Sequence, residues 1–268
     1  MSDLATLPAT EQARLIRTRQ ASPVEVTRAV IERIEAWQPK INAMVVLDAE
    51  RAMDAARAAE AAAMGDAELG PLHGVPVSVK DITAVKGLPT RRGTRLSSPE
   101  PVGHDSPMVA RLKAAGAIIT GKTTATEYGW TAVSTSPLTG HTHNPWKHGR
   151  TAGGSSSGAA ALAGAGCGAL HIGTDGAGSI RLPAHFCGAV GHKPTFGLVP
   201  YAPVTNNGSL SHAGPITRNV PDAALMLEVM AGLHPSDHTT LPGGFRVADM
   251  GPTDLRGLRI AYSPDLGH

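Results

Sequence analysis

Aromatic side chains are scarce in this sequence, at 3% of its 268 residues, whereas glycine, with 31 residues, and alanine are abundant. A core built from such small side chains brings helices and strands close together. Cysteine is also rare: Cys167 and Cys187 form no C-x-x-C pair and stand among apolar residues, Gly and Ala. We therefore expect two buried free thiols in a reducing compartment and no disulfide framework.

The sequence also lacks an excess of one charge and a long hydrophobic run. The formal net charge is +2, and the basic residues are scattered, which argues against direct nucleic-acid binding and against an anionic membrane surface. The longest apolar-looking stretch, 157–173, is mostly Ala and Gly and is too weakly hydrophobic to span a bilayer. Residues 1–15 show no signal peptide, so we expect a soluble, cytoplasmic protein.

Helical and strand patterns alternate along the chain. A capping box at Ser22 and Glu25, with Pro23 at the first helical position, predicts one helix start. Helices are expected over about 9–20, 23–38, 48–64, 107–115, 157–165, from about 179, and 221–231, and strands over about 43–47, 75–79, 117–120, 169–173, 188–193 and 258–262. This alternation predicts an α/β fold with a mixed, largely parallel β-sheet covered by helices on both faces.

Two glycine motifs match patterns of other protein classes. Gly116–Thr123 satisfies the phosphate-binding pattern G-x-x-x-x-G-K-[ST], but that site needs a strand before the first glycine, and here a helix precedes it. Its intervening residues favour a strand, so we expect a helix–turn–strand. Gly154–Gly158 satisfies G-x-S-x-G, which would make Ser156 the nucleophile of an α/β-hydrolase. No apolar strand precedes that turn, which argues against this interpretation.

Three histidines, His141, His143 and His148, stand in a polar stretch. An H-x-H pair followed by a third histidine can bind zinc. No carboxylate or cysteine lies close by in the sequence to complete a ligand set. We expect solvated loop histidines, no metal and no cofactor.

Two serine-glycine turns point to nucleophilic catalysis. Ser179 follows four small residues, 175–178, whose backbone amides can point into a cleft at the start of a helix and stabilise an oxyanion. A second turn, Gly153–Gly158, precedes it by one helix and one strand, and a crossover of that length returns the chain alongside itself. An ordinary glycine turn with a serine cap is the alternative. We predict that Ser155 and Ser179 meet, with Lys80 at the end of a buried strand beside them.

These stretches together resemble the amidase signature family. The resemblance covers nearly the whole chain and lies, in order, in Ser22–Glu25, Gly74–Asp81, Gly116–Thr123, Gly153–Gly158, Gly173–Arg181 and Lys193–Gly197. It implies one amidase domain over 1–268, with a helical region over about 1–65 and a catalytic core over about 70–268. It also implies that Gly116–Thr123 binds no nucleotide.

The resemblance implies a role for each residue of the site. Ser179 would be the acyl-accepting nucleophile, Ser155, preceded by a cis peptide bond, would relay protons, and Lys80 would be the base. A free lysine has a pKa of about 10.4, so Lys80 must be desolvated to accept a proton at neutral pH. The remaining assignments are the oxyanion-hole amides of Gly176, Ala177, Gly178 and Ser179, and supporting roles for Ser156 and for an Asp175–Arg181 ion pair.

The predicted reaction is the hydrolysis of a small-molecule carboxamide through an acyl-enzyme. Alternatives are a glutamine-hydrolysing amidotransferase subunit that works with a partner, an esterase, and an inactive chain with only a binding or assembly role. Members of this family are far longer, and a new strand is expected at 258–262, so we expect this chain to be the N-terminal part of a longer protein. The sequence does not identify the amide, and it leaves a homodimer possible.

Overall fold

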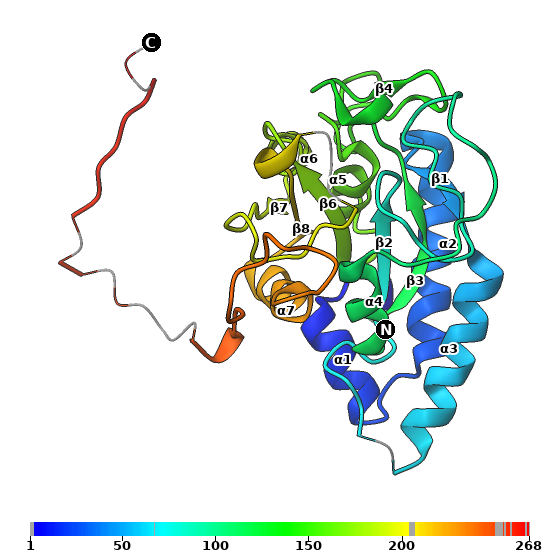
Figure 1. Ribbon diagram of the computed structural model, residues 1–268. Helices are drawn as coiled ribbons and strands as arrows, with labels where there is room; N and C mark the ends of the chain where they lie inside the picture. The colour runs from blue at the N-terminus through cyan, green and yellow to red at the C-terminus, as the bar shows by residue number, and fades with distance from the viewer. Residues whose placement is uncertain are drawn as a thin grey trace.

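The computed structural model describes residues 3–66, 68–203, 207–249, 254, 256–257, 259–265 and 267. Its main elements alternate as predicted (Figure 1). The helices are α1 (Ala9–Arg17), α2 (Pro23–Ile41), α3 (Ala49–Met64), α4 (Pro107–Ala114), α5 (Ser157–Gly164), α6 (Arg181–Cys187) and α7 (Val220–Met230). The strands are β1 (Met44–Leu47), β2 (Pro76–Lys80), β3 (Ile118–Thr123), β6 (Leu170–Asp175), β7 (Val190–Gly191), β8 (His212–Thr217) and the short hairpin of β4 (Thr135–Ser136) and β5 (Gly140–His141).

Six of these strands form one sheet in the order β1-β3-β2-β6-β8-β7. Strand β2 runs parallel to β3 and β6, β8 is antiparallel to β6 and β7, and β1 is antiparallel to β3. Strands β2, β3, β6 and β7 therefore point the same way, and β1 and β8 oppose them. The predicted mixed, largely parallel sheet is confirmed.

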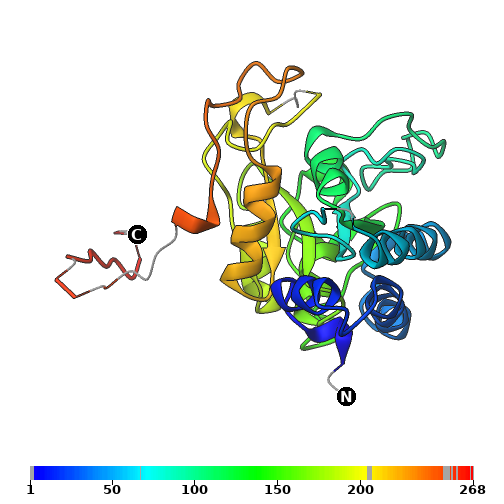
Figure 2. The ribbon, with the colours of Figure 1, turned by 90° about the horizontal axis from the view of Figure 1, so that it is seen from below.

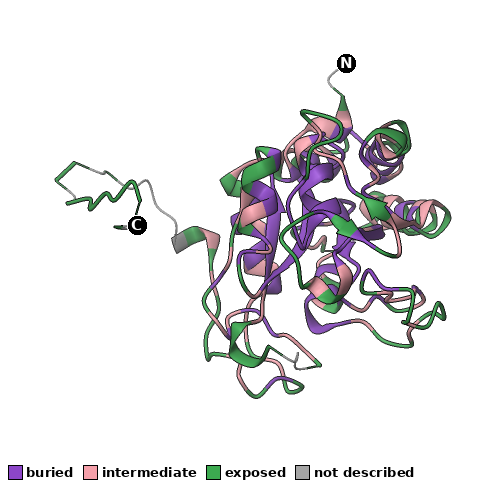
Figure 3. Ribbon diagram, turned by 90° about the horizontal axis from the view of Figure 1, so that it is seen from above, coloured by how far each residue is buried: buried purple, intermediate pink, exposed green. Residues whose placement is uncertain are grey.

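Helices cover both faces of the sheet, as expected. On one face α1, α4 and α7 pack over Val77 and Val79 of β2 and Leu170 and Ile172 of β6. On the other face α2, α5 and α6 share a second buried cluster, and α3 lies against α2 and β3 (Figure 2). Buried residues follow the sheet and the inner sides of these helices (Figure 3).

Small residues allow α5 to lie directly on the strands beside it. A Cβ placed on Gly158 would come within 2.1 Å of the carbonyl oxygen of Ala43 and 2.6 Å of the amide nitrogen of Thr124. The run Ala159–Ala163 that follows is completely buried. Larger side chains at these positions would force the helix away from the sheet, together with the serine turn that starts it.

Several local predictions are correct. The Ser22–Glu25 capping box is present, with the Glu25 amide donating to Ser22 Oγ over 3.1 Å and the Ser22 amide to Glu25 Oε2 over 2.8 Å. Cys167 and Cys187 are buried free thiols. Among the described residues, no helix is both long and apolar enough to cross a bilayer.

Other predictions were wrong. Strand β8 was not predicted, because Gly214 and Pro215 interrupt its apolar pattern. Of the strand expected at 258–262, residues 259–262 form no strand, and position 258 lies outside the described residues. The strand expected at 188–193 is only Val190–Gly191, and the helix expected from about 179 begins at Arg181.

Asp222 joins the N-terminal region to the rest of the fold. Its carboxylate is fully buried at the start of α7 and accepts the amides of Ala9 and Thr10 over 2.9 and 3.0 Å. Asn219 Nδ2 donates to it as well, over 2.7 Å. The first amides of α1, which have no acceptor inside their own helix, are thus satisfied by a residue more than 200 positions away.

We predict that Asp222→Ala lowers the free energy of unfolding by about 1–3 kcal/mol, because buried donors lose their acceptor. Urea denaturation followed by circular dichroism measures this. The matched control is Asp54→Ala, which removes an exposed pair with Arg57 on α3 and should change stability by less than about 0.5 kcal/mol. Equal effects of the two substitutions would contradict this role for Asp222.

Candidate active site

The carboxyl ends of β2 and β6 bring the predicted site residues to one edge of the sheet. Lys80 ends β2, and Ser179 stands in the loop between β6 and α6. The serine turn before α5 reaches the same place, because the Ser156 amide donates to the carbonyl of Ser179 over 3.2 Å. Parallel neighbouring strands leave a crevice at their carboxyl ends, where α/β proteins commonly bind ligands.

Lys80 is buried completely and meets only uncharged acceptors. Its Nζ donates to Ser155 Oγ over 2.7 Å, to Thr174 Oγ1 over 2.8 Å and to the Thr174 carbonyl over 3.4 Å. Burial lowers the pKa of Lys80 to about 7, although the charge of Asp175 acts in the opposite direction. At physiological pH the Lys80 amine is therefore neutral in a substantial share of the molecules, and the neutral amine can accept a proton.

Ser155 is 1% exposed and follows a cis peptide bond to Gly154. Its carbonyl accepts the Thr126 amide over 3.4 Å. Two glycines make room around it: a Cβ on Gly154 would lie 2.6 Å from the Thr131 carbonyl, and one on Gly129 would lie 3.3 Å from Ser155 Oγ. The cis bond expected from the family resemblance is present.

The serine turn is tied to β6 by a second hydroxyl. Ser156 Oγ donates to the Thr174 carbonyl over 3.2 Å and accepts the Thr174 amide over 3.3 Å. Thr174 therefore contacts both Lys80 and Ser156. This threonine was not singled out in the sequence, although it stands inside the motif Gly173–Arg181.

Asp175 organises the loop that carries Ser179. Its buried carboxylate accepts the amides of Gly178 over 2.6 Å and Ile180 over 3.2 Å. Arg181 donates from Nε to Asp175 Oδ2 over 2.9 Å and from Nη2 to Oδ1 over 3.0 Å, so the expected ion pair is present. Burial raises the pKa of Asp175, but the hydrogen bonds from Arg181, Gly178 and Ile180 outweigh it and lower the pKa to about 2.

The amides of this loop are not equivalent. The Gly178 N–H, expected to face an oxyanion, points at Asp175 instead. The N–H groups of Gly176, Ala177 and Ser179 have no acceptor among the described residues. Ala177 is exposed and Ser179 half-buried, so these three donors lie where a ligand can reach them.

A second buried lysine lies on the neighbouring strand. Lys122, opposite Val79 in the sheet register, reaches Asp81 Oδ1 over 3.3 Å, and both side chains are completely buried. Burial lowers the pKa of Lys122 and raises that of Asp81, while their mutual attraction opposes both shifts. Lys122 also donates to the Pro89 carbonyl over 3.2 Å. The lysine of the phosphate-binding pattern is thus half of a structural ion pair on β3, in the predicted helix–turn–strand.

The three histidines lie together at the surface. The ring of His143 is 4.0 Å from that of His148 and 6.4 Å from that of His141. The Nδ1 atoms of His141 and His148 bond to Thr135 Oγ1 and to the Lys40 carbonyl, over 2.8 and 2.9 Å. Within the described part of the chain, no set of three histidines, cysteines or carboxylates is arranged to hold a metal ion.

Comparison with known proteins places this geometry in a family. The family model named Amidase matches residues 25–268, and the chain belongs to this amidase family. An acylamidase from Rhodococcus erythropolis is 42% identical over 99% of this chain and 56% of its own length. A glutamyl-tRNA(Gln) amidotransferase subunit of Salinispora arenicola is 41% identical over 97% of this chain and 54% of its own length.

Solved structures agree with this assignment. A bacterial aryl acylamidase of the amidase signature family superposes with a TM-score of 0.83 at 32% identity, covering 90% of this chain and 50% of the other. The peptide amidase of Stenotrophomonas maltophilia gives a TM-score of 0.81 at 31% identity, covering 88% of this chain and 50% of its own. The chain thus spans about half the length of the relatives it matches.

We predict that Asp175→Ala lowers the free energy of unfolding at pH 7 by about 2–3 kcal/mol, because buried amides and Arg181 lose an ionised acceptor. Arg181→Ala should cost about 1 kcal/mol or less, because that side chain is 54% exposed. Urea denaturation measures both variants.

The deficit of Asp175→Ala should depend on pH. The pKa of Asp175 is about 2 in the folded protein and about 3.9 in an unfolded chain, so the carboxylate stabilises the fold above pH 4 and this contribution is lost as pH falls through 2. The deficit should therefore be roughly halved at pH 3. An unchanged deficit at pH 3 would show that the ionised form is not what stabilises the loop.

Proposed function

We propose that this chain carries the catalytic residues of an amidase that hydrolyses the C–N bond of a carboxamide. One observation carries the proposal: a completely buried amine, Lys80 Nζ, donates to Ser155 Oγ over 2.7 Å and has a pKa of about 7. Perturbed lysines of this kind act as bases in catalysis. Membership of the amidase family supports the same reaction class.

The proposed first half-reaction runs through Ser155. Neutral Lys80 takes a proton from Ser155 Oγ, Ser155 takes the proton of Ser179 Oγ, and Ser179 attacks the carbonyl carbon. The amides of Gly176, Ala177 and Ser179 hold the resulting oxyanion. The C–N bond then breaks, and the proton held by Lys80 returns through Ser155 to the departing amine.

The second half-reaction removes the acyl group from Ser179. Water attacks the ester carbonyl and gives one proton to Ser155 Oγ, whose own proton passes to Lys80. As the bond between the acyl carbon and Ser179 Oγ breaks, that proton returns through Ser155 to Ser179 Oγ, and the product leaves as a carboxylic acid that ionises in water. In both half-reactions the protons move among Lys80, Ser155, Ser179, water and the departing amine. Asp175 therefore needs no role in proton transfer. Its part is to hold the loop in place.

A glutamine-hydrolysing amidotransferase subunit is the second candidate, favoured by the 41% identity to the Salinispora arenicola protein. It uses the same residues on a different substrate and works with a partner. Ammonia release from glutamine, compared with release from simple amides, separates the two candidates. The cytoplasmic location inferred from the sequence suits either one.

Labelling by a fluorophosphonate probe tests the nucleophile. We expect covalent labelling at Ser179, none in Ser179→Ala, and labelling at least about 100-fold slower in Lys80→Met, because the base is lost. Mass spectrometry of the labelled peptide identifies the site. Ser157→Ala, in the same turn but outside the proposed relay, should label at the parent rate.

Folding of the Lys80 variant must be checked alongside its labelling. Lys80→Met removes the cost of burying an amine, so it should unfold at no lower urea concentration than the parent. Full labelling of a folded Lys80→Met would end the relay model.

The pH dependence of kcat/KM tests the state of Lys80. Because the neutral amine is the active form, kcat/KM should rise tenfold per pH unit below about 7 and level off above it. Rates on a panel of amides between pH 5 and 9 measure this. His192, an exposed histidine directly after β7, is the control: His192→Asn should keep the same midpoint, and a midpoint that moved in this variant would assign the titration to the imidazole.

A further inference from the structure

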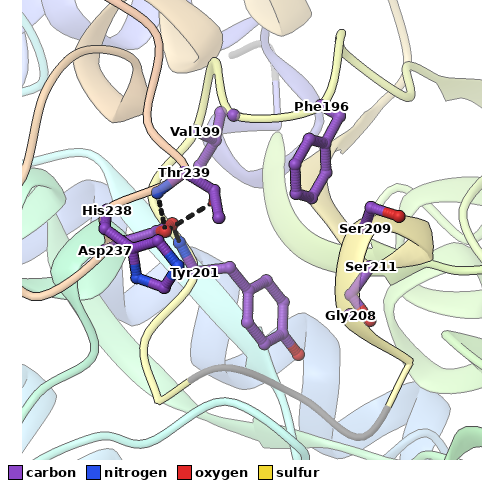
Figure 4. Close-up of a pocket in the computed structure, with 10 residues that line it drawn as sticks. Phe196, Val199, Tyr201, Gly208, Ser209, Ser211, Asp237, His238 and Thr239 are labelled. Atoms are coloured by element: carbon purple, nitrogen blue, oxygen red, sulfur yellow. Dashed lines mark hydrogen bonds between the residues drawn. The ribbon is translucent and has the colours of Figure 1, made fainter.

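A cavity of about 260 Å³ lies between the segment that follows β7 and the segment that follows α7 (Figure 4). Phe196, Val199 and Tyr201 form its apolar wall, and the exposed Ser209 and His238 stand at its rim. The rings of Phe196 and Tyr201 both border the same space in Figure 4. None of these residues was assigned a role from the sequence, although Phe196 stands inside the motif Lys193–Gly197, and none belongs to the proposed proton relay.

Two separate contacts connect this cavity to the site. The Tyr201 side chain interacts with Thr174, whose hydroxyl accepts from Lys80 Nζ over 2.8 Å. The ring of Phe196 meets that of His212 edge to face, with centroids 5.8 Å apart, and His212 Nδ1 lies 3.1 Å from the Asp175 carbonyl oxygen. The cavity wall is therefore connected to Lys80 through Thr174, and to the loop that carries Ser179 through His212 and Asp175.

Asp237, which lines the cavity, has its hydrogen-bonding partners within the protein. This residue is 3% exposed and already accepts the Tyr201 amide, the Thr239 amide and Thr239 Oγ1 over 2.8, 2.9 and 2.6 Å. Burial raises the pKa of Asp237, but these hydrogen bonds outweigh it and lower the pKa, so the carboxylate stays ionised. A fixed negative charge at the edge disfavours a ligand that carries a carboxylate.

The size of the cavity suits a single aromatic ring. An apolar cavity of about 150 Å³ is large enough to bind benzene, so 260 Å³ holds one ring with a small substituent. Phe196 and Tyr201 offer ring edges and faces for offset or edge-to-face contacts. Burial also raises the pKa of Tyr201 to about 12, although its interaction with Thr174 acts to lower that pKa. The Tyr201 hydroxyl therefore stays protonated.

We propose that this cavity binds an uncharged aromatic ring of the amide substrate, next to the carbonyl that Ser179 attacks. The inference rests on the proposed amidase function for the reaction it serves, but the binding itself does not require turnover. The ring can belong to the acyl part of the substrate, as in benzamide, or to the amine part, as in acetanilide.

The test measures binding without hydrolysis, in a Ser179→Ala background. Ligand-observed NMR titrations use benzamide, acetanilide and propionamide as probes. We expect an aromatic amide to bind at least tenfold more tightly than propionamide. Ser209→Phe, which fills the cavity from its exposed rim, should weaken that binding at least fivefold, and Phe196→Ala should weaken it as well. Tyr262→Ala is the matched control, because Tyr262 is 86% exposed and distant in sequence.

The two aromatic probes identify which part of the substrate enters the cavity. Weaker binding of benzamide to Ser209→Phe would place the acyl part there, and weaker binding of acetanilide would place the amine part there. Aromatic probes that bind Ser209→Phe as tightly as the parent would overturn the proposal, as would equal weakening by Tyr262→Ala. Fluorophosphonate labelling of Ser179 separates this result from the proposed function. Labelling without cavity-dependent binding rejects the cavity alone, and cavity-dependent binding without labelling rejects the amidase reaction alone.

Discussion

The burial of one amine without an acidic partner is the constraint on which the rest of this site depends. Lys80 Nζ donates to two hydroxyls and a carbonyl, none of which holds a proton on the amine as a carboxylate would. Asp175, whose charge raises the pKa of Lys80, is itself paired with Arg181 and accepts backbone amides. The ion pair that holds the Ser179 loop therefore also limits how strongly Asp175 can keep Lys80 protonated.

Small side chains make this burial possible. Gly158 and the buried alanines of α5 bring the start of that helix onto β3 and β6, so the serine turn before it can meet the strand ends directly. Ser156 then joins the turn to Thr174 by two hydrogen bonds, and Thr174 Oγ1 in turn accepts a hydrogen bond from Lys80 Nζ. The small residues of α5 thus position the site by letting backbone approach backbone closely.

The parts of this structure that depend on local patterns were predictable. Helix periodicity, the Ser22 cap and the buried run before Lys80 located most elements, and the motif order located Ser155 and Ser179. The parts that depend on distant contacts were not: β8 is a strand because β6 and β7 flank it, despite Pro215. Likewise, nothing in the run 175–179 says which amides turn inward to Asp175 and which stay free.

The two buried lysines differ in the groups that their amines contact. Lys80 and Lys122 lie on adjacent parallel strands, both without exposure to solvent, and burial lowers the pKa of each. Lys122 faces the carboxylate of Asp81, which favours its charged form, whereas Lys80 faces hydroxyls, which do not. Residue type and burial are the same, so what distinguishes the two amines is the group that each contacts directly. That is also why a G-x-x-x-x-G-K-T match around Lys122 has no functional meaning without knowing what its lysine touches.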